Sequence, residues 1–402
     1  MRVFLRQFLG LGAASAIRLA RAASCFGLLA TSSWAEVWEM HSIDNSGQGA
    51  DGVRLADFNQ DGLPDIVTGW EESGVVRLYL NPGYDQAEQA WPNVTVGSGD
   101  SPEDAVAFDI DSDGKLDIVS CHEGKQKQLL VHRFNGELTD NAALLEPQNW
   151  QTSAFDQLNG QQWMFAAPIQ LRGGRSALVA GAKNSQATLT LLTQPDRDSS
   201  ELSNWQTQKL RDAGWTMTLS IIDMDDDGDD DIVFSDRKRG GRGVAWLEQP
   251  NDHAALSVWK EHSVGGHEYE AMFLSASKDE MLLATRNSVW LEYRRTAAEQ
   301  WQETVHPNPP NIPFGKAIRR IDSETLIMTA NSSADGIKSH RQAIWIKRAD
   351  TSWTPIANAT RAKYDRIECL DLDGDGDLDV LTCEEKQNLG VVWYENPALD
   401  KS

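Results

Sequence analysis

The chain has 402 residues, 40% of them hydrophobic, and a formal net charge of -23 at pH 7. It is long enough for two or three ordinary domains, or for one large repeat domain with a sizeable core. Such an acidic protein is a poor binder of nucleic acid or of an anionic membrane surface, so we expect neither as a partner.

The N-terminal segment has the pattern of an export signal. Four arginines and no acidic residue precede the apolar run AASCFGLLA, and Ser33 and Ala35 supply small residues for a cleavage site. We predict a signal peptide over residues 1–35 and a secreted, periplasmic or extracellular mature chain over residues 36–402. Attachment of a lipid through Cys25 stays open. No later run approaches the roughly 20 apolar residues of a membrane span, so we expect none.

An acidic loop pattern occurs four times, at Asp57–Val67, Asp109–Val119, Asp223–Val233 and Asp371–Leu381. Each copy has oxygen-bearing side chains at positions one, three, five and nine, a glycine at position six, and two strand-forming residues directly after. Calcium prefers six to eight oxygen ligands, and the glycine permits the sharp turn that aims alternate side chains at one centre. The predicted metal ligands are Asp57, Asn59, Asp61, Asp65, Asp109, Asp111, Asp113, Asp117, Asp223, Asp225, Asp227, Asp231, Asp371, Asp373, Asp375 and Asp379. We therefore expect about four Ca2+ sites.

The segments on either side of each loop are short and rich in strand-forming residues, such as GVRLADF before the first loop and DIVTGW after it. An EF-hand would instead need a helix on each side and a glutamate at position twelve. The strand–loop–strand unit resembles the FG-GAP/VCBS repeat family. That resemblance implies an all-β, integrin-like propeller, and activities that range from adhesion and carbohydrate binding to carbohydrate-active enzymes.

The spacing of tryptophans predicts the number of blades. Trp38, Trp91, Trp150, Trp205, Trp259, Trp301 and Trp353 each open a strand-like run, with successive separations of 42 to 59 residues. That spacing fits one four-stranded blade per repeat, and hence seven blades in a single domain over residues 36–402. The run near Trp38 should complete the last blade, because an open ring would expose two unpaired sheet edges.

The mature chain has three cysteines, Cys121, Cys369 and Cys383, which is no disulfide framework. Cys369 and Cys383 lie on the strands before and after one loop. Two interpretations of this pair are kept: a disulfide across the two strands, or two buried free thiols.

Functional side chains should gather on the face opposite the acidic loops. The residues predicted there as ligand contacts are Asp51, Glu103, Asp104, Trp163, Trp215, Glu270, Lys316, Tyr364 and Asp365. Acids, bases and aromatic rings in one concavity suit a polysaccharide, since rings stack on sugar faces while charged groups bind hydroxyls or carboxylates. The alternatives are an extracellular protein ligand and pure adhesion through a flat face. Exposed rings of Trp70, Trp163 and Trp215 favour ligand binding in this prediction. We expect a monomer.

An enzyme on the same face is the rival hypothesis. The chain has no nucleophile elbow, Gly-rich phosphate loop or HExxH zinc motif. His122, Lys316, Tyr364 and Arg237 could nevertheless supply a base, an acid and a carboxylate clamp for a polysaccharide lyase or a sugar dehydratase.

Overall fold

The computed structural model describes residues 37–138, 141–239, 241–251, 258–297, 300–332, 342–349, 351–357 and 359–397. The predicted signal peptide over residues 1–35, with Cys25 and the cleavage site near Ala35, lies outside the described residues. Among the described residues, no helix is long and apolar enough to cross a membrane.

The described chain forms seven four-stranded antiparallel sheets. The strands of the first four sheets are β2 (Ala50–Ala56), β3 (Asp65–Trp70), β4 (Val75–Tyr79) and β5 (Asn93–Ser98); β6 (Pro102–Phe108), β7 (Asp117–His122), β8 (Leu129–Phe134) and β9 (Trp150–Ala154); β10 (Gln162–Leu171), β11 (Arg175–Lys183), β12 (Thr188–Thr193) and β13 (Gln206–Asp212); and β14 (Thr216–Ile222), β15 (Asp231–Asp236), β16 (Gly243–Glu248) and β17 (Lys260–Gly265).

The strands of the last three sheets are β18 (Ala271–Ala276), β19 (Glu280–Thr285), β20 (Val289–Ala297) and β21 (Gln300–Pro307); β22 (Gly315–Arg320), β23 (Thr325–Ala330), β24 (Ile344–Arg348) and β25 (Thr354–Pro355); and β26 (Tyr364–Leu370), β27 (Asp379–Glu384), β28 (Gly390–Tyr394) and β1 (Met40–Asp44). The connections between strands contain one short helix, α1 (Asn141–Leu144), and the 3-10 turns η1 (Tyr84–Gln86), η2 (Pro147–Asn149), η3 (Asp156–Leu158) and η4 (Leu202–Asn204).

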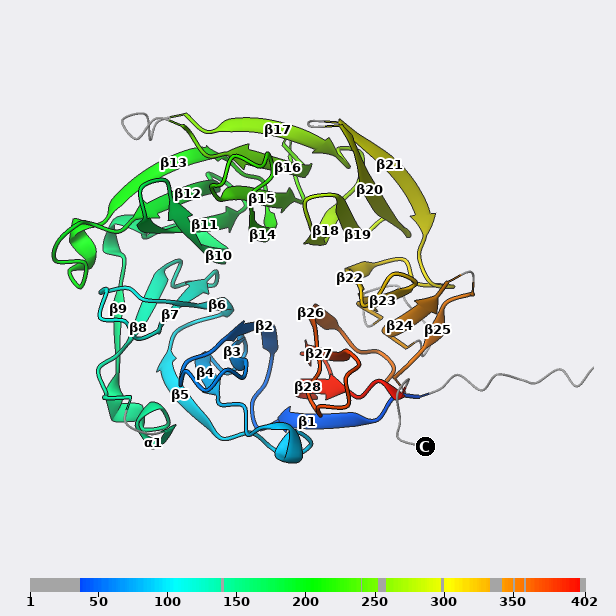
Figure 1. Cartoon of the computed structure of the whole chain (residues 1–402), viewed down its shortest axis with the longest axis horizontal. Helices are drawn as coiled ribbons and strands as arrows, with labels where there is room; N and C mark the ends of the chain where they lie inside the picture. Colours follow the sequence, from blue (N-terminus) through cyan, green and yellow to red (C-terminus); the bar gives the residue numbers. More distant parts are fainter. Residues whose placement is uncertain are drawn as a thin grey trace, which may run out of the picture. The chain divides into compact units, whose positions relative to one another are not determined.

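The seven sheets are the blades of a propeller (Figure 1). The innermost strands contact one another in the order β2, β6, β10, β14, β18, β22 and β26, and β26 contacts β2 again. The first strand of the described chain, β1, pairs antiparallel with β28, with Met40 opposite Tyr394 and His41 opposite Trp393. The predicted seven-bladed propeller, closed by its N-terminal strand, is therefore confirmed.

The core lies between the blades. All six residues are buried in each of the second strands β3, β7, β15, β23 and β27. These strands lack the alternation of a half-exposed sheet because neighbouring blades cover both of their faces. The repeated Trp91, Trp150 and Trp205 are also buried, which is the structural role that their spacing suggests.

No disulfide links the described cysteines. Cys121 and Cys383 are buried and Cys369 is half-buried, and all three are free thiols. Cys369 lies opposite Val380, whereas Cys383 lies opposite Val391 on the next strand. The bridge left open for Cys369 and Cys383 is absent because the register does not place them opposite each other.

Candidate functional site

The innermost strand of each blade runs from one face of the propeller to the other. In the first blade, Ala50 pairs with Trp70 at one end of the hairpin, and Ala56 pairs with Asp65 at the other end, beside the acidic loop. The acidic loops therefore lie on one face, and the starts of the innermost strands surround the channel at the other face. We call this second opening the channel mouth.

Three of the acidic loops bring carboxylates together as a metal site requires. Each of these three sets has ligand oxygens within 4.8 Å of one another: Asp109, Asp111 and Asp117; Asp223, Asp225 and Asp231; Asp371, Asp373 and Asp379. In the first loop, Asn59 takes the third position and its amide donates to Asp61 at 2.8 Å. Donor sets made only of oxygen fit a hard cation such as Ca2+.

The glycine at position six shapes each loop. Gly62, Gly114, Gly228 and Gly376 have φ angles of 87°, 85°, 91° and 98°, a region that favours glycine. Each of their N–H groups donates to the aspartate at position one, at 3.0 to 3.2 Å. The turn and the orientation of the first predicted ligand thus depend on the same residue.

The aspartate at position nine also fixes each loop to its blade. In the first blade, Asp65 accepts the backbone N–H groups of Phe58 and Asn81, both at 2.8 Å. Asp117, Asp231 and Asp379 accept the two corresponding N–H groups in their own blades. Burial raises the pKa of Asp65 to about 6 and that of each of the other three to about 7. A nearby cation would favour their ionised form.

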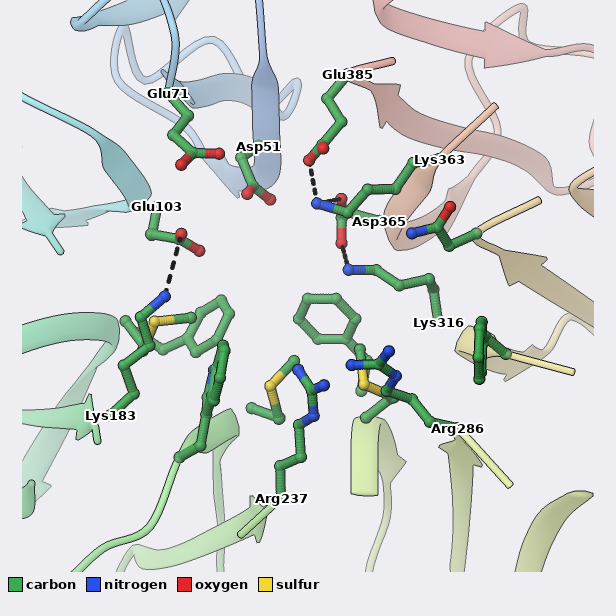
Figure 2. A pocket seen from close by; sticks show the side chains of 18 of the residues that line it. Asp51, Glu71, Glu103, Lys183, Arg237, Arg286, Lys316, Lys363, Asp365 and Glu385 are labelled. Atoms are coloured by element: carbon green, nitrogen blue, oxygen red, sulfur yellow. Dashed lines mark hydrogen bonds and ion pairs between the residues drawn. The ribbon is translucent and has the colours of Figure 1, made fainter. Parts of the chain in front are cut away.

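The channel mouth holds a cavity of about 390 Å³. Each innermost strand supplies at least one lining residue, and those at the corresponding position are, in order, Asp51, Glu103, Met164, Met217, Met272, Lys316 and Asp365. Three successive blades supply methionines, and the other four supply charged groups. Phe165, Phe273 and Phe314 extend the apolar side of the cavity. The mouth therefore has a charged wall and, opposite it, a mainly apolar wall beside which Arg237 and Arg286 lie (Figure 2).

A β-bulge at the mouth end of every innermost strand presents these side chains. The pairing register shifts between Pro102 and Asp104 in β6, and between Trp163 and Phe165 in β10. The other five innermost strands have the same irregularity at the same place. The extra residue in a bulge is unpaired and its side chain is re-aimed, which here directs residues such as Glu103 and Met164 into the cavity.

The charged wall is an ion-pair network. Lys316 pairs with Asp365, and Lys363 pairs with Glu385 and lies 3.5 Å from Asp365. Burial works against ionisation of Asp365, but the charges of Lys316 and Lys363 outweigh it and lower its pKa. Burial likewise opposes the charge of Lys363, whose pKa is raised well above its ordinary value by Asp365, Asp51 and Glu385. Asp365 and Lys363 therefore stay ionised at neutral pH.

Trp215 joins the two walls. Its ring lies under Lys183 and Arg237, each 4.5 Å from the ring centre, and under Lys238 at 4.1 Å. Cations placed over an aromatic face are attracted by the ring quadrupole. Arg237 also lies 3.8 Å from Glu270, and Arg286 lies 3.7 Å from the same carboxylate. Two guanidinium groups thus share a single acid at this side of the mouth.

Comparison with known proteins supports the same family as the loop pattern. A family model of the FG-GAP-like repeat matches residues 57–120, which contain the first two acidic loops. Together with the seven blades, this match supports a propeller of the FG-GAP/VCBS type.

Two solved structures show the same fold at low sequence identity. This propeller is similar to BBS1N, crystallised in complex with ARL6DN, with 11% identity, a TM-score of 0.50, and coverage of 90% of this chain and 97% of that chain. It is also similar to YCF48 bound to D1 peptide, with 11% identity, a TM-score of 0.52, and coverage of 89% and 94%. At this identity the likeness concerns the fold alone. No curated protein matches the chain.

Two tryptophans predicted at the ligand surface of the propeller are core residues instead. Trp163 has no exposed surface, and its Nε1 donates to the carbonyl of Leu158 at 3.1 Å. Trp70 is equally buried and donates to the Tyr79 hydroxyl at 2.8 Å. Of the three rings predicted to be exposed, only Trp215 lines the cavity. The prediction was wrong because the neighbouring blade covers the strand ends that carry Trp70 and Trp163.

Two of the predicted catalytic residues, Tyr364 and His122, do not reach the cavity. Tyr364 is fully buried and shares a hydrogen bond with the Tyr394 hydroxyl at 2.5 Å. His122 is also fully buried, between Ser120 and the carbonyl of Asp100, and burial lowers its pKa. Neither can serve as an acid or base for a ligand in the mouth.

Asp104 points into the wall of the channel rather than into the mouth. It makes a two-pronged ion pair with Arg54, at 2.7 Å for both contacts, and accepts the backbone N–H of Ala166. Its role is to hold together three blades. Of the remaining predicted residues, Asp51, Glu103, Arg237, Lys316 and Asp365 line the cavity, and Glu270 lies beside it.

The sequence-based set missed the apolar wall and Lys363. Met164, Met217 and Met272 occupy the same place in their blades as Asp51 in the first, so alignment of the innermost strands could have identified them. Lys363 directly precedes β26 and bridges to Asn331, and no local motif distinguishes it from other surface lysines.

Proposed function

We propose that the mature chain is an exported, calcium-binding recognition module that binds an acidic saccharide in the channel mouth. One observation carries this proposal: the mouth combines an apolar wall with a charged wall in a single cavity of about 390 Å³. A sugar ring has the matching chemistry, with C–H groups on its faces and hydroxyls at its edges. The volume lies within the roughly 300–1,000 Å³ of small-molecule sites.

The two walls would divide the contacts. The ring of Phe273 would contact the C–H face of a sugar, beside Trp215, which holds Lys183 and Arg237 at the cavity. Among the residues that the structure describes, Arg237 and Arg286 form ion pairs with Glu270 alone, at 3.8 and 3.7 Å, which leaves guanidinium N–H donors for a ligand carboxylate. Planar guanidinium groups bind carboxylates with two parallel hydrogen bonds. A uronate unit therefore suits this mouth better than a neutral sugar.

The acidic loops would have a structural role on the opposite face. Their carboxylates repel one another without a cation, so a bound Ca2+ should stabilise the folded chain. A site filled to about a thousand times its dissociation constant contributes about 4 kcal/mol. Because these loops lie at the far end of the innermost strands, they would stabilise the blades without contacting the saccharide.

A panel of acidic and neutral oligosaccharides tests the proposal. Binding would be measured by calorimetry, and products by mass spectrometry, for the wild type, Arg237→Ala and the control Arg175→Ala. Arg175 is an exposed arginine at the loop end of β11. We expect uronate-containing ligands to bind the wild type and the control, and Arg237→Ala to bind at least about tenfold more weakly, the effect of losing roughly 1.4 kcal/mol.

Other outcomes have clear meanings. New unsaturated or dehydrated fragments would make the mouth catalytic and support the lyase or dehydratase hypothesis, in which only Lys316 and Arg237 of the four predicted residues line the cavity. If Arg237→Ala and Arg175→Ala weakened saccharide binding equally, the channel mouth would not be the binding site. Absence of binding to every saccharide would leave an extracellular protein as the ligand class.

A further inference from the structure

Asp51 is a buried carboxylate without a direct partner. Its residue is 6% exposed, and among the residues that the structure describes it makes neither a hydrogen bond through its side chain nor an ion pair. Figure 2 shows its carboxylate pointing into the cavity between Glu71 and Lys363. Removing an ionised carboxylate from water is unfavourable unless a positive charge or hydrogen-bond donors compensate for the loss. Lys363 acts on Asp51 through its charge but is itself paired with Asp365 and Glu385, so the charge of Asp51 is incompletely compensated.

Two groups of carboxylates meet at Asp51. Its oxygen lies within 4.8 Å of ligand atoms of Glu71 and Glu103 on one side, and of Asp365 and Glu385 on the other. The second group already has the ammonium groups of two lysines, which pair with Asp365 and Glu385. It needs no further cation.

The first group is poorly neutralised. Lys183 lies 3.8 Å from Glu103 but is closer to Glu123, which is its main partner. Glu71, directly after β3, has no ion pair among the described residues. Asp51, Glu71 and Glu103 thus form a negative pocket that favours either protons or a cation.

We infer that Asp51, Glu71 and Glu103 bind a divalent cation of the hard class, Ca2+, Mg2+ or Mn2+, in the channel mouth. Oxygens around a Ca2+ ion at about 2.4 Å lie at most about 4.8 Å apart, and the three carboxylates have oxygens within that limit of one another. The set contains no nitrogen or sulfur, so zinc and copper are poor matches. Three carboxylates would leave coordination positions for water or for a ligand oxygen in the cavity.

This site differs from the acidic loops in its construction. Each loop takes its ligands from one short stretch of chain, whereas the mouth site joins β2, the turn after β3, and β6 of the next blade. A bound ion would therefore link the first and second blades and complete the charged wall. The inference does not depend on the saccharide proposal, because the metal alone is sufficient to test it.

The test is a count of bound metal. The purified protein would be dialysed against Ca2+, Mg2+ or Mn2+ up to millimolar concentration and the bound metal measured by mass spectrometry. We expect Asp51→Asn to bind one equivalent fewer than the wild type. The matched control is Glu72→Gln, which removes the neighbouring exposed charge and should retain the full count. The difference between variants is informative whether or not the acidic loops are filled.

A second measurement locates the ion and guards against misfolding. An anomalous difference peak from Mn2+ between Asp51, Glu71 and Glu103 in crystals would place it directly. In metal-free buffer, Asp51→Asn should melt at or above the wild-type temperature, because it removes a buried, repelled charge. Equal metal counts in the wild type and Asp51→Asn would overturn the inference. Butylammonium, a monovalent organic cation, is a second probe. Its binding at these carboxylates, without binding of any divalent metal, would also overturn the inference.

Discussion

Trp163→Ala and Trp215→Ala should separate the core of the propeller from its binding surface. Trp163 has no exposed surface and donates a hydrogen bond to Leu158. Replacement of a buried tryptophan by alanine removes about 3–5 kcal/mol of stability, so we expect about 4 kcal/mol here. With an unfolding entropy of about 2.1 cal/mol/K for each of roughly 360 residues, that loss lowers Tm by about 5 °C.

Trp215→Ala should give the opposite pattern. Trp215 is half-buried, lines the cavity and lies beneath three cations. Its loss should lower Tm by less than about 2 °C, the shift for roughly 1.5 kcal/mol, but should weaken ligand binding at least about tenfold. Differential scanning calorimetry and titration with the selected saccharide measure the two quantities. A wild-type melt for Trp163→Ala, or undiminished binding by Trp215→Ala, would refute this division.

Three further results are expected. Asp104→Ala should destabilise the protein by about 3–5 kcal/mol in denaturant titrations, because it leaves Arg54 partly buried without its two-pronged partner; a loss under 1 kcal/mol would contradict this. Burial lowers the pKa of His132 in the folded protein to about 3. Between about pH 6.5 and 3 the unfolded chain therefore binds a proton that the folded chain does not bind. The free energy of unfolding should fall by up to roughly 5 kcal/mol as the pH falls through that window. His132→Gln should flatten that part of the urea-melt pH profile, and an unchanged slope would assign it to other groups. Chelation should lower the wild-type Tm, and Asp373→Asn with Asp375→Asn should reduce that effect, whereas a melt unaffected by chelator would count against calcium as a stabilising ion.

The propeller could be predicted because its signals are local and repeated. Each acidic loop fixes a hairpin, and the recurring tryptophans mark one outer strand per blade. The strand near Trp38 had no partner within its own repeat, so closure with β28 was the remaining way to protect the sheet edges. These features depend on spacing, which is directly visible in a sequence.

The mouth was harder to predict because a bulge interrupts the alternation of each innermost strand. Around Trp163, strand pairing alone does not say whether Trp163, Met164 or Phe165 faces the channel. The register shift directs Met164 into the cavity and leaves Trp163 between blades. His122 and Tyr364 failed as candidate catalytic groups because both are buried, His122 against Ser120 and the carbonyl of Asp100 and Tyr364 against Tyr394.

A crystal structure with the tightest-binding oligosaccharide tests the central claim most directly. We predict electron density in the channel mouth, with a sugar face against Phe273 and a carboxylate at Arg237 and Arg286. Density on the acidic-loop face or along the outer strands, with the mouth free of ligand, would contradict the account.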